Sequence, residues 1–219
     1  MVSRGWRGGV GRWARASFCA AVIFGAAASA FATSLNVRVQ SGGSSAVTVP
    51  PGATVNWAVV GELSDNLNAG LALFSVDLAW TGGPLSPAAN PTAGPMVNFN
   101  RPAGLTNPAG FGGTVVGGQL RQVGGAQNTI KNTFAPYPMG IVVTGVAAAG
   151  APVTLAAGQL TAPVAPGTYT LSPSGLVANV IRQGETGTPF WHVDRANAGS
   201  VQSLVVQVSP PVTGRRRER

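Results

Sequence analysis

Acid–base catalysis in this chain of 219 residues would depend on very few side chains. His192 is the only histidine, and Asp194 follows two residues later, on the same face if the segment is a strand. A Ser-His-Asp triad also needs a nucleophilic serine, and no Gly-x-Ser-x-Gly sequence provides one. One histidine does not form a zinc site by itself. We therefore interpret His192 as a loop or edge side chain beside Trp191, and we predict no catalytic residue and no metal site.

Glycoside hydrolysis is the remaining hydrolytic chemistry to consider, because it needs only two carboxylates. Between the first 32 residues and the basic C-terminus the chain has five acids, namely Glu62, Asp65, Asp77, Glu185 and Asp194. Any β-sandwich of this size could carry as many, so a glycoside hydrolase is the least favoured function. Asp77 is predicted mid-strand, on the face opposite Phe74, Val76 and Leu78, where solvent exposure or a cross-strand partner such as an arginine would explain it.

Loops that bind ions or phosphate are not indicated. Residues 65–70 come nearest to a calcium loop, but Leu67 and Ala69 occupy positions that need oxygen ligands. We interpret the segment as a turn. The paired glycines lack the Gly-Lys-Ser ending and the helix of a phosphate-binding loop. No cofactor is therefore expected.

Aromatic side chains are the remaining candidates for ligand binding. Trp57, Phe74, Trp80 and Tyr169 follow an alternating pattern and are predicted to lie in the core. Six others lie in loop-like sequence, namely Phe99, Phe111, Phe134, Tyr137, Phe190 and Trp191. From these we select Trp191, Tyr137 and Phe111 as candidate ligand-binding residues, since exposed rings can stack on sugars. The alternative interpretation is that loop aromatics close the ends of a β-sandwich.

Basic residues are concentrated at the two ends of the chain. The formal net charge is +8, yet four arginines lie in the first fifteen residues and four in the last five. Residues 33–213 contain six basic and five acidic side chains. A nearly neutral body does not indicate nucleic-acid binding.

The first 32 residues have the three parts of an export signal. Residues 1–15 are basic, residues 16–31 are apolar, and Ala28-Ser29-Ala30 or Ala30-Phe31-Ala32 could precede the cleavage site. The apolar run is shorter than the roughly 18–20 residues of a membrane-spanning helix. Cleavage after Ala32 would leave no permanent membrane span and a secreted or cell-surface protein, with the periplasm as an alternative location.

Cys19 is the only cysteine, and it lies within this apolar run. A lipoprotein signal needs a small residue before the cysteine, whereas Phe18 stands there, so lipidation is not expected. Removal of the segment would leave no cysteine, and hence no disulfide. The domain must then be stabilised by its hydrophobic core, which a domain of roughly 180 residues can provide.

The elements that would position these residues are strands. Charged residues make up 9% of the chain, while it has 31 glycines and 17 prolines, which indicates turn-rich all-β structure. Period-two alternation predicts the main strands at 35–40, 46–49, 54–63, 71–80, 141–146, 153–162, 168–181 and 201–208. Within the Gly- and Pro-rich residues 81–140, shorter strands are predicted at 96–99, 114–116 and 119–122. We therefore expect a single domain over residues 33–209 and a disordered basic tail over residues 210–219.

Two segments resemble a known domain family. Residues 47–80 (VTVPPGATVNWAVVGELSDNLNAGLALFSVDLAW) resemble the first half of cohesin-like domains, in which a Pro-Gly turn precedes a strand, an Asn-rich turn and a second strand. Residues 155–174 (LAAGQLTAPVAPGTYTLSPS) are similar to their later hairpin, which turns at Pro-Gly-Thr-Tyr. Residues 124–130 (GGAQNTI) resemble a group of exported bacterial proteins that carry such a domain.

The resemblance implies an antiparallel jelly-roll β-sandwich of about nine strands, related to carbohydrate-binding modules. It also implies a role in extracellular attachment or assembly. The hypothesis from sequence is therefore a secreted, non-catalytic β-sandwich acting in adhesion, matrix or protein assembly, with a carbohydrate-binding module as the alternative. Its partner would be an extracellular protein or a polysaccharide.

Overall fold

The computed structural model describes residues 33–89, 99–100, 112–127, 145–182 and 193–210. The chain divides after Phe31 into two units, and all described residues belong to the second. These residues form eleven strands and no helix, so none of them belongs to a helix that could span a membrane. The strands are β1 (Ser34–Gln40), β2 (Ala46–Val49), β3 (Thr54–Leu63), β4 (Asn68–Trp80), β5 (Phe99–Asn100), β6 (Gly112–Val116), β7 (Gln119–Gln127), β8 (Val153–Thr161), β9 (Gly167–Arg182), β10 (Val193–Gln202) and β11 (Leu204–Val208).

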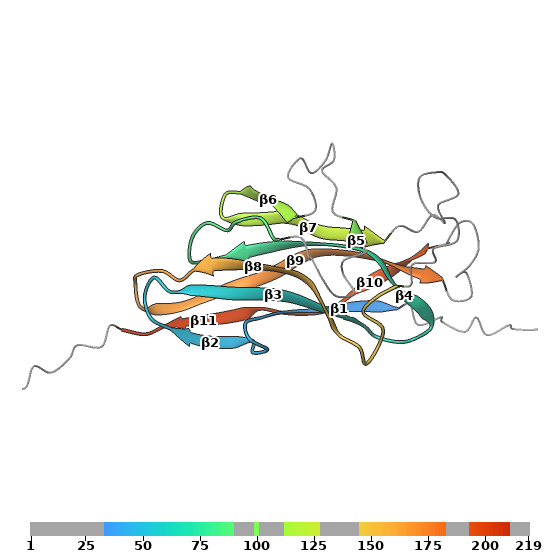
Figure 1. Cartoon of the computed structure of the whole chain (residues 1–219), viewed down its shortest axis with the longest axis horizontal. Coiled ribbons are helices and arrows are strands. Elements are labelled where there is room, and N and C mark those ends of the chain that lie inside the picture. Colours follow the sequence, from blue (N-terminus) through green and yellow to red (C-terminus); the bar gives the residue numbers. More distant parts are fainter. Residues whose placement is uncertain (1–32, 90–98, 101–111, 128–144, 183–192, 211–219) are drawn as a thin grey trace, which may run out of the picture. The chain divides into compact units, whose positions relative to one another are not determined.

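The strands form two hydrogen-bonded layers that share β10 (Figure 1). In the first layer the order is β10-β1-β3-β8. In the second, β9 pairs with β4, β4 with β7, and β7 with both β6 and β5, while β11 and β2 extend the layer from β9. The beginning of β10 pairs with β9 and its end pairs with β1, so this strand passes from one layer to the other.

The first and last strands run parallel to each other. β1 pairs with β10 and β2 pairs with β11 in parallel, whereas all other strand pairings of the described residues are antiparallel. Each terminal strand is broken once, between β1 and β2 and again at Ser203. The all-β sandwich expected from the sequence is confirmed, and these two breaks account for eleven strands where about nine were expected.

Alternation places the apolar side chains between the two layers. In β3 the inward residues include Val55, Trp57 and Val59, and in β4 they include Phe74 and Leu78, each at most 3% exposed. Together with side chains from the other strands they form one contiguous core. A side chain at Gly158 in β8 would overlap the indole of Trp57, so the ring occupies the space that the glycine leaves. The core positions predicted for Trp57, Phe74 and Trp80 are confirmed.

One short segment connects the two layers at their outer strands. The backbone N–H of Ala88 donates to the carbonyl of Gly112 in β6 at 2.6 Å. The N–H of Ala89 donates to the carbonyl of Ala157 in β8 at 3.0 Å. We call residues 85–89 the edge connector, because β6 and β8 belong to different layers and the segment bonds to both.

The predicted strand limits differ most from the observed ones in β10 and β7. The last predicted strand, 201–208, misses most of β10, in which only Ala196 is buried and the apolar alternation is lost. β7 extends to Gln127, beyond the predicted end at Gln122. Most of the predicted strands 96–99 and 141–146 lies outside the described residues, although Val146 forms an isolated bridge with Leu71.

Candidate functional site

The candidate ligand-binding residues Trp191, Tyr137 and Phe111 lie outside the described residues, as does His192. Of the predicted core aromatics, Tyr169 is only half-buried: its ring is 6.1 Å from that of Trp80, and its hydroxyl donates to the carbonyl of Ala165 at 3.0 Å. The described aromatic side chains therefore belong to the core or to its margin, and they form no exposed stacking platform.

Carboxylates in the described part of the chain are held by structural hydrogen bonds. Glu62 accepts from the backbone N–H of Gly150 at 2.7 Å. Asp194 pairs with Arg182 of the neighbouring strand β9 at 2.7 Å. No group of three His, Cys, Asp or Glu side chains that could hold a metal ion occurs among these residues. Glu185, another of the five acids considered from the sequence, lies outside the described residues.

Asp65 is the centre of a polar cluster in the turn between β3 and β4. Its Oδ1 atom accepts from the Thr33 hydroxyl at 2.9 Å, the Leu67 N–H at 3.0 Å and the Asn68 amide at 3.3 Å. Its Oδ2 atom accepts from the Ser64 hydroxyl at 3.0 Å. Desolvation acts to raise the pKa of Asp65, but these hydrogen bonds outweigh it and hold the pKa below its ordinary value. The turn expected at residues 65–70 is thus built around this carboxylate.

Asp77 lies opposite irregular positions in both neighbouring strands. The registers with β7 and with β9 each shift beside it, and both neighbours contain a residue at positive φ there, Gln122 at 58° and Gly175 at 60°. The Oδ1 atom of Asp77 accepts from the Gln122 backbone N–H at 2.8 Å. The sequence suggested solvent exposure or a cross-strand partner such as an arginine. The partner found is on the neighbouring strand, and it is the backbone of a β-bulge, not an arginine.

The first layer has a strongly polar outer surface. Its outward side chains on β1, β3, β8 and β10, which we call the polar face, include Asn36, Arg38, Gln40, Asn56, Glu62, Gln159, Ser200 and Gln202. Several of them bond to one another, as Gln159 does to Asn56 at 3.0 Å. The surface is therefore already organised by side-chain hydrogen bonds.

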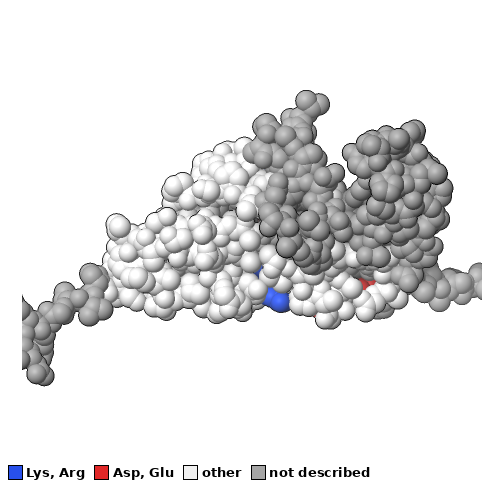
Figure 2. Space-filling view, in the orientation of Figure 1, with Lys and Arg blue, Asp and Glu red and all other residues white. Residues whose placement is uncertain are grey.

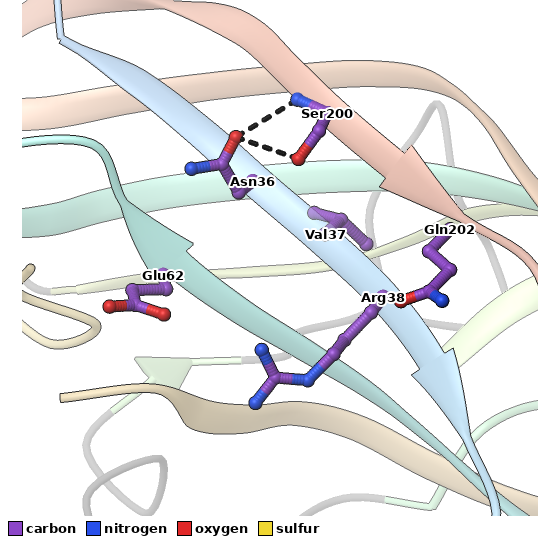
Figure 3. A pocket seen from close by; sticks show the side chains of 6 residues that line it. All are labelled: Asn36, Val37, Arg38, Glu62, Ser200 and Gln202. Carbon is purple, nitrogen blue, oxygen red and sulfur yellow. Dashed lines mark hydrogen bonds between the residues drawn. The ribbon is translucent and has the colours of Figure 1, made fainter. Parts of the chain in front are cut away.

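A shallow hollow of about 100 Å³ lies on the polar face (Figure 3). It is lined by Asn36, Val37, Arg38, Glu62, Ser200 and Gln202. Asn36 is fixed because its Oδ1 atom accepts from both the N–H and the hydroxyl of Ser200, at 2.9 and 3.0 Å. In Figure 3, Glu62 extends from β3 on one side of β1, and Gln202 extends from β10 on the other. The hollow thus offers a guanidinium, a carboxylate and amides to a small polar ligand.

The second layer has a very different outer surface, which we call the neutral face. It is formed by Leu73, Ser75, Asp77 and Ala79 of β4, Ser172, Ser174, Val177 and Asn179 of β9, Gln119, Arg121 and Ala126 of β7, and Thr114 and Val116 of β6. Among these residues only Asp77 and Arg121 are charged, and both are bonded within the layer, Arg121 to Gln119 at 3.2 Å. The exposed Arg195 of β10 lies at the margin of the face, opposite Asn179. Val177 and Val116 are each 46% exposed.

Neither outer face was selected from the sequence, although the signal was present. Alternation along β4 assigns Ser75 and Asp77 to the side opposite Phe74 and Val76. What alternation does not reveal is which strands are neighbours, and the neutral face exists only because β9 and β7 flank β4. Figure 2 shows one side of the molecule, on which few of the described side chains are charged.

No protein-family model and no curated protein matches the chain. Among solved structures, the chain is similar to the seventh type I cohesin of ScaB from Pseudobacteroides cellulosolvens, at 11% identity and a TM-score of 0.51. That match covers 85% of this chain and 99% of the other.

Two further matches have lower TM-scores. The Coh-OlpA–Doc918 complex of Clostridium thermocellum matches at 9% identity, over 80% of this chain and 99% of the other, with a TM-score of 0.45. A type II cohesin domain from the cellulosome of Acetivibrio cellulolyticus matches at 12% identity, over 79% and 95%, with a TM-score of 0.42. From its two strand layers and the match along almost all of the ScaB domain, the chain has a cohesin-like β-sandwich fold.

Proposed function

We propose that this protein is a secreted or cell-surface, non-catalytic β-sandwich that assembles with another extracellular protein through its neutral face. The composition of that face carries the proposal: its side chains are mostly small or uncharged, and two exposed valines lie on it. The cohesin-like fold agrees with a role in assembly, as the sequence resemblance implies.

Binding through the neutral face would require little desolvation of charge. The centre of a protein interface is depleted in charged residues, because an unpaired charge is costly to bury. Asp77 and Arg121 each have a hydrogen-bond partner within the layer, so part of their polar bonding is kept when the face is covered. Small side chains such as Ser75 and Ala79 also let a second protein approach the sheet closely.

Assembly rather than catalysis is favoured by the roles of the acids. Glu62, Asp65, Asp77 and Asp194 each hold backbone or side-chain groups of the fold. Glu62 lies on the outer surface of the first layer and Asp77 on that of the second, so these two do not share a cleft. A hydrolase would require two acids that face a common substrate.

The assembly function is tested by capture of partners from the culture medium with the exported protein as bait. We expect Val177→Asp, in the neutral face, to abolish capture of proteins bound by the wild type. Val201→Asp is the matched control. Val201 is similarly exposed, at 51%, but it lies where β10 pairs with β1 in the first layer, outside the neutral face. Equal capture by the two variants would overturn the neutral face as the interface.

Carbohydrate binding is the second candidate function, and the hollow on the polar face is the observation that favours it. Sugar hydroxyls both donate and accept hydrogen bonds, which suits the guanidinium of Arg38, the carboxylate of Glu62 and the amide of Gln202. On a glycan array, Arg38→Ala should lose a retention that Arg121→Ala keeps. Trp191→Ala, Tyr137→Ala and Phe111→Ala test a stacking contribution in the same assay. No retention by the wild-type protein would exclude this function.

A further inference from the structure

Thr33 precedes the first strand, and both its backbone and its side chain are part of the fold. Its carbonyl accepts from the N–H of Asn197 at 2.8 Å. Its hydroxyl donates to Asp65 at 2.9 Å and accepts from the Asn68 amide at 3.1 Å. The residue is 9% exposed and is the buried polar residue of the described chain. A residue that precedes the strands is thus bonded to the fold through both its backbone and its side chain.

Asp65, the partner of Thr33, accepts hydrogen bonds, but it forms no ion pair with a cationic side chain of the described residues. Its four donors are hydroxyl, amide and backbone groups. The ion pair found among the described residues joins Arg182 of β9 to Asp194 of β10 and does not include Asp65. A carboxylate that is ionised, partly buried and without a counter-ion among the described residues favours the arrival of a positive charge.

We propose that Thr33 is the N-terminal residue of the mature protein and that its free α-ammonium becomes the counter-ion of Asp65. In threonine the nitrogen and Oγ1 are about 3 Å apart, and Oγ1 lies 2.9 Å from Asp65 Oδ1. The ammonium therefore lies within about 6 Å of the carboxylate, a range at which opposite charges attract. In the unprocessed chain this nitrogen is an uncharged amide.

The covalent step is the hydrolysis of the Ala32–Thr33 peptide bond by an endopeptidase. Water adds to the carbonyl of Ala32, the C–N bond breaks, and Ala32 keeps the water oxygen in its new carboxylate. The nitrogen of Thr33 takes up both protons of the water and becomes an ammonium group. No oxidant or cofactor is needed. The pairing with Asp65 is a reason for cleavage between Ala32 and Thr33 that the sequence of the export signal does not contain.

The alternative cleavage after Ala30 would have a different consequence. The mature chain would then begin at Phe31, and two extra residues can move the ammonium about 7 Å away from Thr33. Asp65 would keep its hydrogen bonds but lose the counter-ion. The two processing sites therefore predict proteins of different stability.

The test begins with the exported protein as it is secreted. Its intact mass should correspond to a chain that begins at Thr33, and any other start overturns the proposal. Lys131 is the only lysine, so in a Lys131→Arg background acetylation modifies the α-amine alone. We expect acetylation to lower the Tm by about 2–4 °C, the shift for roughly 1 kcal/mol in a domain of this size.

Asp65 is identified as the partner by a double-mutant cycle. In Asp65→Asn, acetylation should no longer change the Tm, whereas in Glu62→Gln it should lower the Tm as in the wild type. Equal shifts in Asp65→Asn and wild type overturn the pairing. A protein made to begin at Phe31 provides a test without any change at Asp65. Its Tm should be lower than that of the protein that begins at Thr33, and acetylation should not change it. If acetylation lowered the Tm of both proteins equally, the proposal would be overturned.

Discussion

At the scale of single residues, the fold depends on polar groups that close turns and bulges rather than on surface ion pairs. Asp65 holds the β3–β4 turn, and Asp77 holds the bulge at Gln122. The salt bridge between Arg182 and Asp194 joins side chains that are about half exposed, at 52% and 51%, and such exposed pairs contribute little. Substitutions at the two aspartates should therefore matter more than loss of the ion pair.

Asp65 should make the protein sensitive to acid. Because its pKa is lowered in the folded state, its contribution to stability is complete above the unfolded value of about 4. The contribution is lost as the pH falls through the lower, folded pKa. Asp65→Asn should therefore flatten the dependence of Tm on pH between about pH 5 and pH 2. Glu62→Gln is the control, and an unchanged acid profile in Asp65→Asn would contradict the role of the cluster.

Gly158 should be intolerant of even the smallest side chain. A Cβ atom at this position would overlap the indole of Trp57, which is 2% exposed and cannot move outward. Gly158→Ala should lower the free energy of unfolding by about 1–3 kcal/mol, as overpacking usually does. Chemical denaturation measures this, and Thr161→Ala on the same strand should change it by less than about 0.5 kcal/mol. Equal effects would show that the ring can be displaced.

At the scale of elements, the register of β4 with its two neighbours is set by paired irregularities. Gln122 and Gly175 lie at positive φ on opposite sides of Asp77. The bulges add one residue to each neighbouring strand, so the apolar alternation on both sides of the shift faces the core. The neutral face and the core beneath it thus depend on the same carboxylate.

Asp77→Ala should weaken this arrangement more than Asp77→Asn. The alanine removes the acceptor of the Gln122 N–H, and loss of such a bond costs about 1–2 kcal/mol. Asparagine retains a carbonyl oxygen in nearly the same place. Urea unfolding of the two variants provides the comparison. If both lost the same stability, the charge of Asp77 and not its hydrogen bond would be responsible.

The sequence predicted those strands that bury one face, and it missed most of β10, which buries almost no side chains. In β3 and β4 the alternation of Trp57, Phe74 and Leu78 with polar residues gives the strand and its inward face. β10 is held by pairing with β9 and β1, and because its side chains are mostly exposed it has no alternating pattern. The same reason hides both outer faces: a surface assembled from four strands is defined by their order, and order is not encoded locally.

At the scale of the whole domain, the two layers are joined at both margins. β10 bonds to a strand of each layer on one side, and the edge connector bonds to β6 and β8 on the other. Outer strands with unpaired backbone groups invite pairing with other chains. The connector satisfies part of this backbone, so fewer unpaired groups remain at these edges for pairing with another chain.

Truncation should separate the essential end of the chain from the dispensable one. β11 contributes the buried residues Leu204, Val206 and Val208, and it pairs with both β9 and β2. A chain that ends at Ser203 should lose cooperative thermal unfolding, as followed by near-ultraviolet circular dichroism. A chain that ends at Pro210 should keep the wild-type Tm, as expected for a solvated basic tail. A lower Tm in the second chain would give the last nine residues, 211–219, a structural role.

The parallel pairing of the terminal strands has a mechanical consequence. β1 begins beside Asn197 and β2 ends beside Val208, so the two ends of the domain leave the paired strands in opposite directions. A force applied between Thr33 and Ser209 would slide β1 against β10 and β2 against β11. The hydrogen bonds along these pairs would then be loaded together rather than opened one after another. A domain attached at one end and pulled from the other would therefore resist tension along the direction in which its terminal strand pairs are strongest.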